Sequence, residues 1–184
     1  MKIGISINGI VRDLHTKIKA VHEKYYESKI SGSLTEKNML SKLDFENEDK
    51  LLDFLFEEAP MEIYGHAKEV SPNLIRGINE LVLRRNDISI TLISDEVGRA
   101  IPATYWFLAK FGSQVKNICF IKQKDKKNIW ENFDIIVTND EKIIKNKPEN
   151  KILVSSRNFK NVDTKIKKIK EILNLDILVK DGEK

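Results

Sequence analysis

Polar side chains that could grip an anion or a metal ion follow four separate apolar runs of this 184-residue chain. In chain order they are Ser6, Asn8 and Gly9; Ser94 and Asp95; Lys126 and Lys127; and Thr138, Asn139 and Asp140. Hydroxyls, loop amides and ammonium groups bind phosphate, whereas carboxylates bind Mg²⁺. Either chemistry requires these groups to converge, so the apolar runs must bring them to one edge of the fold.

The apolar runs have the length and composition of buried β-strands. They cover residues 1–8, 88–93, 115–121, 134–137 and 151–154. Apolar residues three and four apart predict helices over 13–26, 38–43, 48–57, 71–82, 96–111, 126–132 and 162–173. Strands that are apolar throughout and alternate with helices are typical of a doubly wound parallel sheet, the α/β class. Ligands of such a sheet bind outside the carboxyl ends of the strands, where these polar residues are expected.

The stretch between the first strand and the second interrupts this alternation. Residues 14–70 carry helical patterns and no strand pattern. We therefore expect one domain over residues 1–184, whose core of residues 1–13 and 71–184 carries a small helical insertion over about residues 14–70.

Composition argues against several classes of protein. The 32 Lys and Arg against 28 Asp and Glu leave a net charge of +4, which lacks the dense basic face of a dedicated nucleic-acid binder. The single cysteine, Cys119, lies in an apolar run, so a buried, inert thiol is expected and a disulfide framework is not. No apolar stretch has the length of a membrane span or of a signal core. These features favour a cytoplasmic protein without membrane contact. The many Lys, Asn and Ile residues point to an AT-rich bacterial or viral genome, and a viral protein would reside in the host cytoplasm or the virion.

The order of these segments resembles that of a known family. Residues 3–13, an apolar strand followed by Ser6-Ile7-Asn8-Gly9 and then Arg-Asp, are similar to the first motif of haloacid-dehalogenase-like hydrolases. Residues 90–94 resemble the second motif, the lysines around Lys126 occupy the third, and residues 133–140 resemble the fourth. The resemblance covers nearly the whole chain, and it makes the helical insertion a cap like that of the 5'-nucleotidase-like branch.

The resemblance also implies what this chain lacks. In the family one aspartate of the first motif attacks phosphorus and a second moves the proton, while carboxylates of the first and fourth motifs hold Mg²⁺. Ser6 and Asn8 stand at the two aspartate positions, and Thr138 and Asn139 stand where an acidic pair is expected. We expect no catalytic residue and no metal cofactor at these positions.

We expect a catalytically inactive, haloacid-dehalogenase-like domain that acts as a binding or structural module. An anion pocket would be formed by Gly9, Ser94, Asp95, Lys126 and Lys127, with a small phosphorylated ligand, and a protein partner or self-association is expected. These polar groups also fit a plainer role, in which they cap loop amides and Ser94 starts a helix.

The alternative is an active Mg²⁺-dependent phosphatase of the 5'-nucleotidase-like kind. It would take its missing carboxylates, and its metal ligands, from Asp13 and Asp140. A nucleic-acid partner bound through the lysine-rich patch at residues 122–127 is not expected, because the net charge is low.

Overall fold

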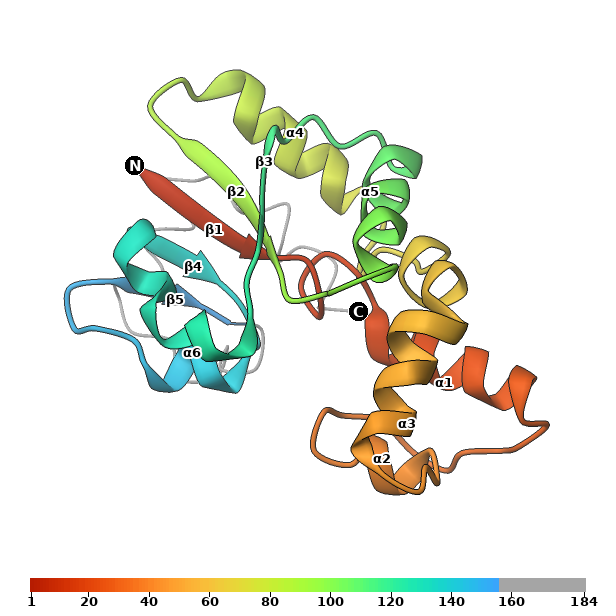
Figure 1. The fold of residues 1–184 in the computed structure, drawn as a ribbon. Helices are drawn as coiled ribbons and strands as arrows, with labels where there is room; N and C mark the ends of the chain where they lie inside the picture. Colours follow the sequence, from red (N-terminus) through yellow and green to blue (C-terminus); the bar gives the residue numbers. More distant parts are fainter. Residues whose placement is uncertain (156–184) are drawn as a thin grey trace. The chain divides into compact units, whose positions relative to one another are not determined.

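The computed structural model describes residues 1–155, which include a five-stranded, all-parallel sheet (Figure 1). The strands are β1 (Lys2–Ser6), β2 (Ser89–Ser94), β3 (Asn117–Phe120), β4 (Ile135–Val137) and β5 (Ile152–Val154), and their order is β3-β2-β1-β4-β5. This confirms the predicted α/β class and the parallel sheet. The helix expected over residues 162–173 lies outside the described residues.

Strand β1 is central, with β2 on one side and β4 on the other. Ile3 pairs with Ile90 of β2 and Ile135 of β4, and the last residue of β1, Ser6, pairs with Ile93. Residues 3–6 are all buried, which explains why this strand is apolar almost throughout. The strand order reverses between β1 and β4, and such a switch point is where ligands of open parallel sheets bind.

Contacts within the chain divide it into two units, and the sheet belongs to the first. Of the described residues, this sheet unit holds 1–11, 69–95 and 112–155, with α4 (Leu74–Arg84), the 3-10 helix η3 (Gln123–Asn132) and α6 (Glu141–Lys145). One face of the sheet is packed by η3 and α6 through a cluster of Ile93, Ile129, Trp130, Phe133, Ile136 and Ile143. Gly4 of β1 leaves room for this layer, because a Cβ there would lie 2.5 Å from Ile93 Cδ1 and 3.2 Å from the Phe133 ring.

The second unit contains residues 12–68 and 96–111 and has only helices as regular elements. They are α1 (Leu14–Tyr25), α2 (Met39–Lys42), α3 (Glu48–Asp53), the π-helices η1 (Phe54–Glu58) and η2 (Met61–Gly65), and α5 (Ala100–Lys110). Of the insertion expected over about residues 14–70, residues 14–68 fall in this helical unit, and residues 69 and 70 are grouped with the sheet; α5, which was expected in the core, is grouped with the helical unit.

A buried arginine joins distant segments of the helical unit. Arg12 is fully buried; its guanidinium forms an ion pair with Glu96 and donates to Thr104 Oγ1 at 2.9 Å and to the Tyr64 carbonyl at 3.1 Å. It also lies 5.2 Å from the centre of the Phe107 ring. Because a buried cation is costly unless it is paired, these contacts make Arg12 a structural link between the chain before α1 and the α5 segment.

Two helices begin later than the sequence predicts, each for a backbone reason. The predicted helix from Glu96 begins at Ala100, after Gly98 adopts a φ of +55°. Ser94 is therefore the last residue of β2 and does not cap this helix, whose N-cap is Arg99. The helix expected from residue 71 begins at Leu74, because Asn73 at its N-cap has a left-handed φ of +63°.

Candidate functional site

Two hydroxyl groups meet where β1 and β4 end. Ser6 Oγ donates to Thr138 Oγ1 at 2.7 Å, and Thr138 Oγ1 also accepts from the Asp140 backbone N–H at 3.1 Å. Both side chains are buried. The parallel pairing of β1 with β4 explains their closeness, since the carboxyl ends of neighbouring parallel strands lie side by side. The pair is neutral and its hydrogen bonds are internal.

An amide side chain links the loop after β1 to the end of β5. Asn139 Nδ2 donates to the Gly9 carbonyl at 3.0 Å, and its Oδ1 accepts from Ser155 Oγ at 2.9 Å. Gly9 has a φ of +75°, which glycine adopts without the Cβ clash of other residues. Asn139 thus connects the loop after β1 to the end of β5 through two hydrogen bonds.

A lysine and two aspartates, which we call the ion triad, form the charged part of this edge. Lys126 Nζ lies 2.7 Å from Asp95 Oδ2, after β2, and 2.5 Å from Asp140 Oδ2, after β4. The lysine side chain is 4% exposed, against 30% for Asp95 and 16% for Asp140. Burial alone would lower the pKa of Lys126, but the two carboxylates outweigh burial and raise it. The ammonium is therefore held charged.

Both carboxylates of the ion triad have further partners. Asp95 accepts from Gln123 Nε2 at 2.9 Å through Oδ2 and from Asn8 Nδ2 at 3.3 Å through Oδ1. Asp140 Oδ1 caps α6 by accepting from the backbone N–H groups of residues 142 and 143, at 2.8 and 3.2 Å. The oxygens that would coordinate a ligand or a cation are already engaged in holding the fold.

The structure brings together most of the residues expected at this edge. Lys126 lies at its centre because residues three apart share a face of a 3-10 helix, so that Lys126 and the core residue Ile129 point inward together. Lys127 is exposed instead. Ser94, at the end of β2, is buried. Asp13 belongs to the helical unit, where its backbone N–H donates to the Lys68 carbonyl at 2.9 Å.

Sequence reasoning missed two residues of the edge and the capping role of Asp140. Gln123 and Ser155 carry no pattern that marks them, and they join the edge only through tertiary contacts. The signal for the cap was readable, because an Asp followed by an acidic residue and an apolar pair is a helix start. That signal would have assigned Asp140 to α6.

Within residues 1–155 no three His, Cys, Asp or Glu side chains are grouped so that they could hold a metal ion. None of the helices described there is long and apolar enough to cross a membrane. No protein-family model matches the sequence, and neither does any curated protein.

Proposed function

We propose that this chain is a haloacid-dehalogenase-like module that binds a ligand or a partner and does not transfer phosphoryl groups. The single observation that carries the proposal is the internal use of the sheet-edge groups. The Ser6 hydroxyl donates its hydrogen bond to Thr138, and the Lys126 ammonium forms ion pairs with both Asp95 and Asp140.

A nucleophile at Ser6 would need a base within hydrogen-bond reach. The acceptor of its hydroxyl is Thr138, which cannot take a proton at neutral pH. Asn8 directs its amide N–H toward Asp95, and an amide cannot shuttle a proton in place of an aspartate. The groups that replace the two aspartates of the resembled motif supply neither step of the family's chemistry.

The charge of the ion triad bears on the ligand. One ammonium between two carboxylates leaves a net charge of about −1, which repels a phosphate unless Lys126 exchanges a partner. The ligand favoured here is one that hydrogen-bonds to the neutral groups of the edge, with phosphate bound weakly.

Phosphatase assays with Mg²⁺ and an aryl phosphate test the absence of phosphoryl transfer. We expect no turnover above background by the wild type, and the same from Lys127→Met, which alters an exposed lysine. Turnover by the wild type that Ser6→Ala abolishes would overturn the proposal and support the phosphatase alternative. The variant Ser6→Asp/Asn8→Asp asks whether the two carboxylates alone restore hydrolysis.

Thermal unfolding with added inorganic phosphate tests whether the sheet edge binds phosphate only weakly. Because the ion triad is net negative, the wild-type Tm should not rise as phosphate is added, beyond the rise seen with a sulfate control. A specific, saturable rise that Lys126→Met removes would show that the anion pocket persists.

A further inference from the structure

A single buried histidine holds the two ends of one segment of the helical unit. The segment comprises residues 28–43 and includes α2, and we call it the α2 segment. At its first residue, Ser28 Oγ lies 3.2 Å from Nδ1 of His22, which is a residue of α1. At its last residue, the Leu43 carbonyl accepts a hydrogen bond from the His22 ring. The ring is buried, so one side chain of α1 ties both ends of the segment to this helix.

The backbone on either side of the α2 segment is strained. Glu27, immediately before the segment, has a φ of +49°, and Asp44, immediately after it, has a φ of +54°. Within residues 1–155 only one other residue besides glycine, Asn73, has a positive φ. Because a Cβ opposes this left-handed conformation, both positions raise the free energy of the chain as folded here. Residues that can release strain by rotating are suited to act as hinges, and here they flank a single segment.

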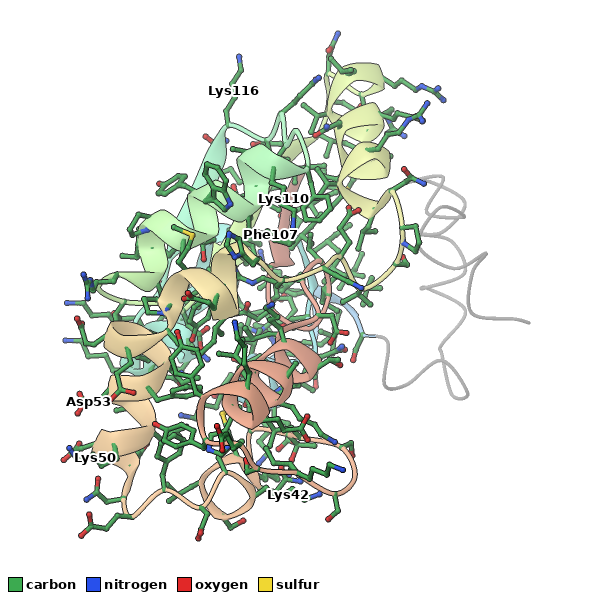
Figure 2. All side chains as sticks on the ribbon, turned by 90° about the vertical axis from the view of Figure 1, so that its right-hand side faces the viewer. Lys42, Lys50, Asp53, Phe107, Lys110 and Lys116 are labelled. Atoms are coloured by element: carbon green, nitrogen blue, oxygen red, sulfur yellow. The ribbon has the colours of Figure 1, made fainter. Side chains whose placement is uncertain are left out.

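Other contacts keep the α2 segment closed on the rest of the helical unit. Glu23 Oε1 of α1 accepts from the Ile30 backbone N–H at 2.8 Å. Lys42 Nζ, at the end of α2, donates to the carbonyls of Ser31 and Ser33, so the segment is also tied to itself (Figure 2). Four apolar side chains of the segment belong to the core of the unit: Ile30, Leu34, Met39 and Leu43. These contacts make opening a rare event at neutral pH, and the internal ties let the segment move as one piece.

Aromatic rings surround the imidazole of His22. The centres of the Tyr26, Phe45 and Phe54 rings lie 4.5, 5.4 and 5.7 Å from its centre. A charge in these surroundings is removed from water, which favours the neutral ring. A neutral imidazole has one N–H and one acceptor nitrogen, which match the carbonyl at one end of the α2 segment and the hydroxyl at the other. The closed segment therefore fits the neutral form of His22.

The charged groups around this ring do not reverse that preference. They are Glu23 of α1, which pairs with Lys19 at 4.0 Å, Asp44 after α2, and Glu58 of η1, which accepts from Tyr26 at 3.4 Å. Glu23 and Asp44 each act to raise the pKa of His22, but burial outweighs them and lowers it below the ordinary 6.5. In the closed segment, a proton on His22 is therefore less stable than on a histidine in water.

We propose that protonation of His22 opens the α2 segment by rotation at Glu27 and Asp44, while the rest of the helical unit stays folded. Opening brings the imidazolium into water, releases the two left-handed residues and exposes the aromatic rings. The closed state has its full stability above pH 6.5 and loses it as pH falls from 6.5 to the lowered pKa, below which the loss stops. The sheet edge takes no part in this opening, so the proposal can fail without affecting the proposed function.

Hydrogen exchange of the full chain, followed by NMR between about pH 5 and 7.5, tests the opening. The exchange rate of an amide divided by its intrinsic rate gives the constant for opening the structure that protects it. Ile30 and Leu43 report on the α2 segment, since their N–H groups donate at 2.8 and 3.0 Å. Ile63 of η2, which donates at 2.9 Å, reports on the rest of the unit. At each pH, the opening constant of Ile30 and Leu43 should exceed that of Ile63 by about tenfold or more.

The pH dependence of the opening constant identifies the group that takes up the proton. Below pH 6.5 the constant of the α2 segment should rise by up to about tenfold per pH unit and level off at the pKa of His22. NMR of the imidazole protons measures that pKa in the same sample. The total rise should be about tenfold for each unit by which the measured pKa lies below 6.5. This comparison uses the unaltered chain, so it does not depend on the folding of any variant.

Replacing the histidine removes the titration. In His22→Gln, which keeps a side chain that can hydrogen-bond, the opening constant of the α2 segment should vary by less than about twofold over the same pH range. The matched control is His66→Gln, which alters an exposed histidine of the same unit and should keep the full rise of the wild type.

Three results would overturn the proposal. Equal opening constants for Ile30 and Ile63 would mean that the unit opens as a whole. An opening constant that does not change with pH in the wild type would mean that the segment does not respond to the proton. A rise that persists in His22→Gln would mean that another group takes up the proton.

Discussion

Replacing Lys126 by Met is the sharpest test of the ion triad. Methionine keeps an unbranched stem of similar length, so packing is largely retained and the charge is removed. Asp95 and Asp140 are then left close together without their shared cation. Removing one partner of a fully buried ion pair costs about 3–5 kcal/mol, and the partial exposure of these two carboxylates reduces this to about 2–4 kcal/mol. For a chain of this size, that corresponds to a fall in Tm of roughly 5–15 °C.

Urea unfolding followed by circular dichroism measures this loss. The matched control, Lys127→Met on the exposed side of η3, should change the free energy of unfolding by at most about 0.5 kcal/mol. In the double variant Lys126→Met/Asp140→Asn most of the loss should return. The asparagine removes one of the two charges and can still cap α6 through its Oδ1.

The dependence of the loss on salt separates charge from packing, and its dependence on pH follows the charge of Lys126. Repulsion between the two unpaired carboxylates is screened by salt, so the loss of stability in Lys126→Met should shrink as the ionic strength rises. In the wild type the pKa of Lys126 is raised, so its contribution is intact below the ordinary value of 10.5 and is lost only as pH rises above it. A loss of stability no larger than that of Lys127→Met, or one of equal size at low and high salt, would refute the reasoning.

Three further predictions concern other parts of the chain. Gly9→Ala should lower the free energy of unfolding by about 1–2 kcal/mol, because the φ of +75° opposes a Cβ although no atom lies near it; an unchanged value in urea unfolding would contradict this. Burial lowers the pKa of His22 below its ordinary 6.5, so the wild type should lose stability as pH falls below 6.5, down to the lowered value, and His22→Gln should lose less over the same pH series. Arg12→Met should lower the free energy of unfolding by about 3–5 kcal/mol, and Arg12→Met/Glu96→Gln should lower it clearly less in a double-mutant cycle. Equal losses in the two variants would mean that the unpaired Glu96 carboxylate does not cause the loss of stability.

The strands of the sheet unit could be predicted from local apolar runs in the sequence. Each described strand falls inside a predicted apolar run or extends one residue beyond it, and β1 and β4 are apolar because they are buried almost throughout. Element boundaries were less readable. The start of α5 moved to Ala100 because the chain first turns through the positive φ of Gly98, and such a turn leaves no periodic signal.

In the helical unit, local sequence patterns predicted the helices but not which helices pack together. Its helices were expected, but the grouping of α5 with them depends on contacts between residues far apart in the chain. Arg12 illustrates why: its partners Tyr64, Glu96 and Thr104 are 52 to 92 positions away. No local spacing encodes which carboxylate pairs with a buried arginine.

By itself, the sequence determined which chemical groups stand at the carboxyl ends of β1 and β4. The identities of Ser6 and Asn8 are facts of the sequence, and a hydroxyl and an amide cannot act as carboxylates in any fold. Only the tertiary structure decided what those groups and their neighbours contact. The 3-10 turn of η3 selects Lys126 over Lys127, and α6 engages one oxygen of Asp140 as a cap while Lys126 holds the other. The physical reason is that residue type sets the charge and hydrogen-bonding capacity of a side chain, whereas its partners follow from the packing of segments distant in sequence.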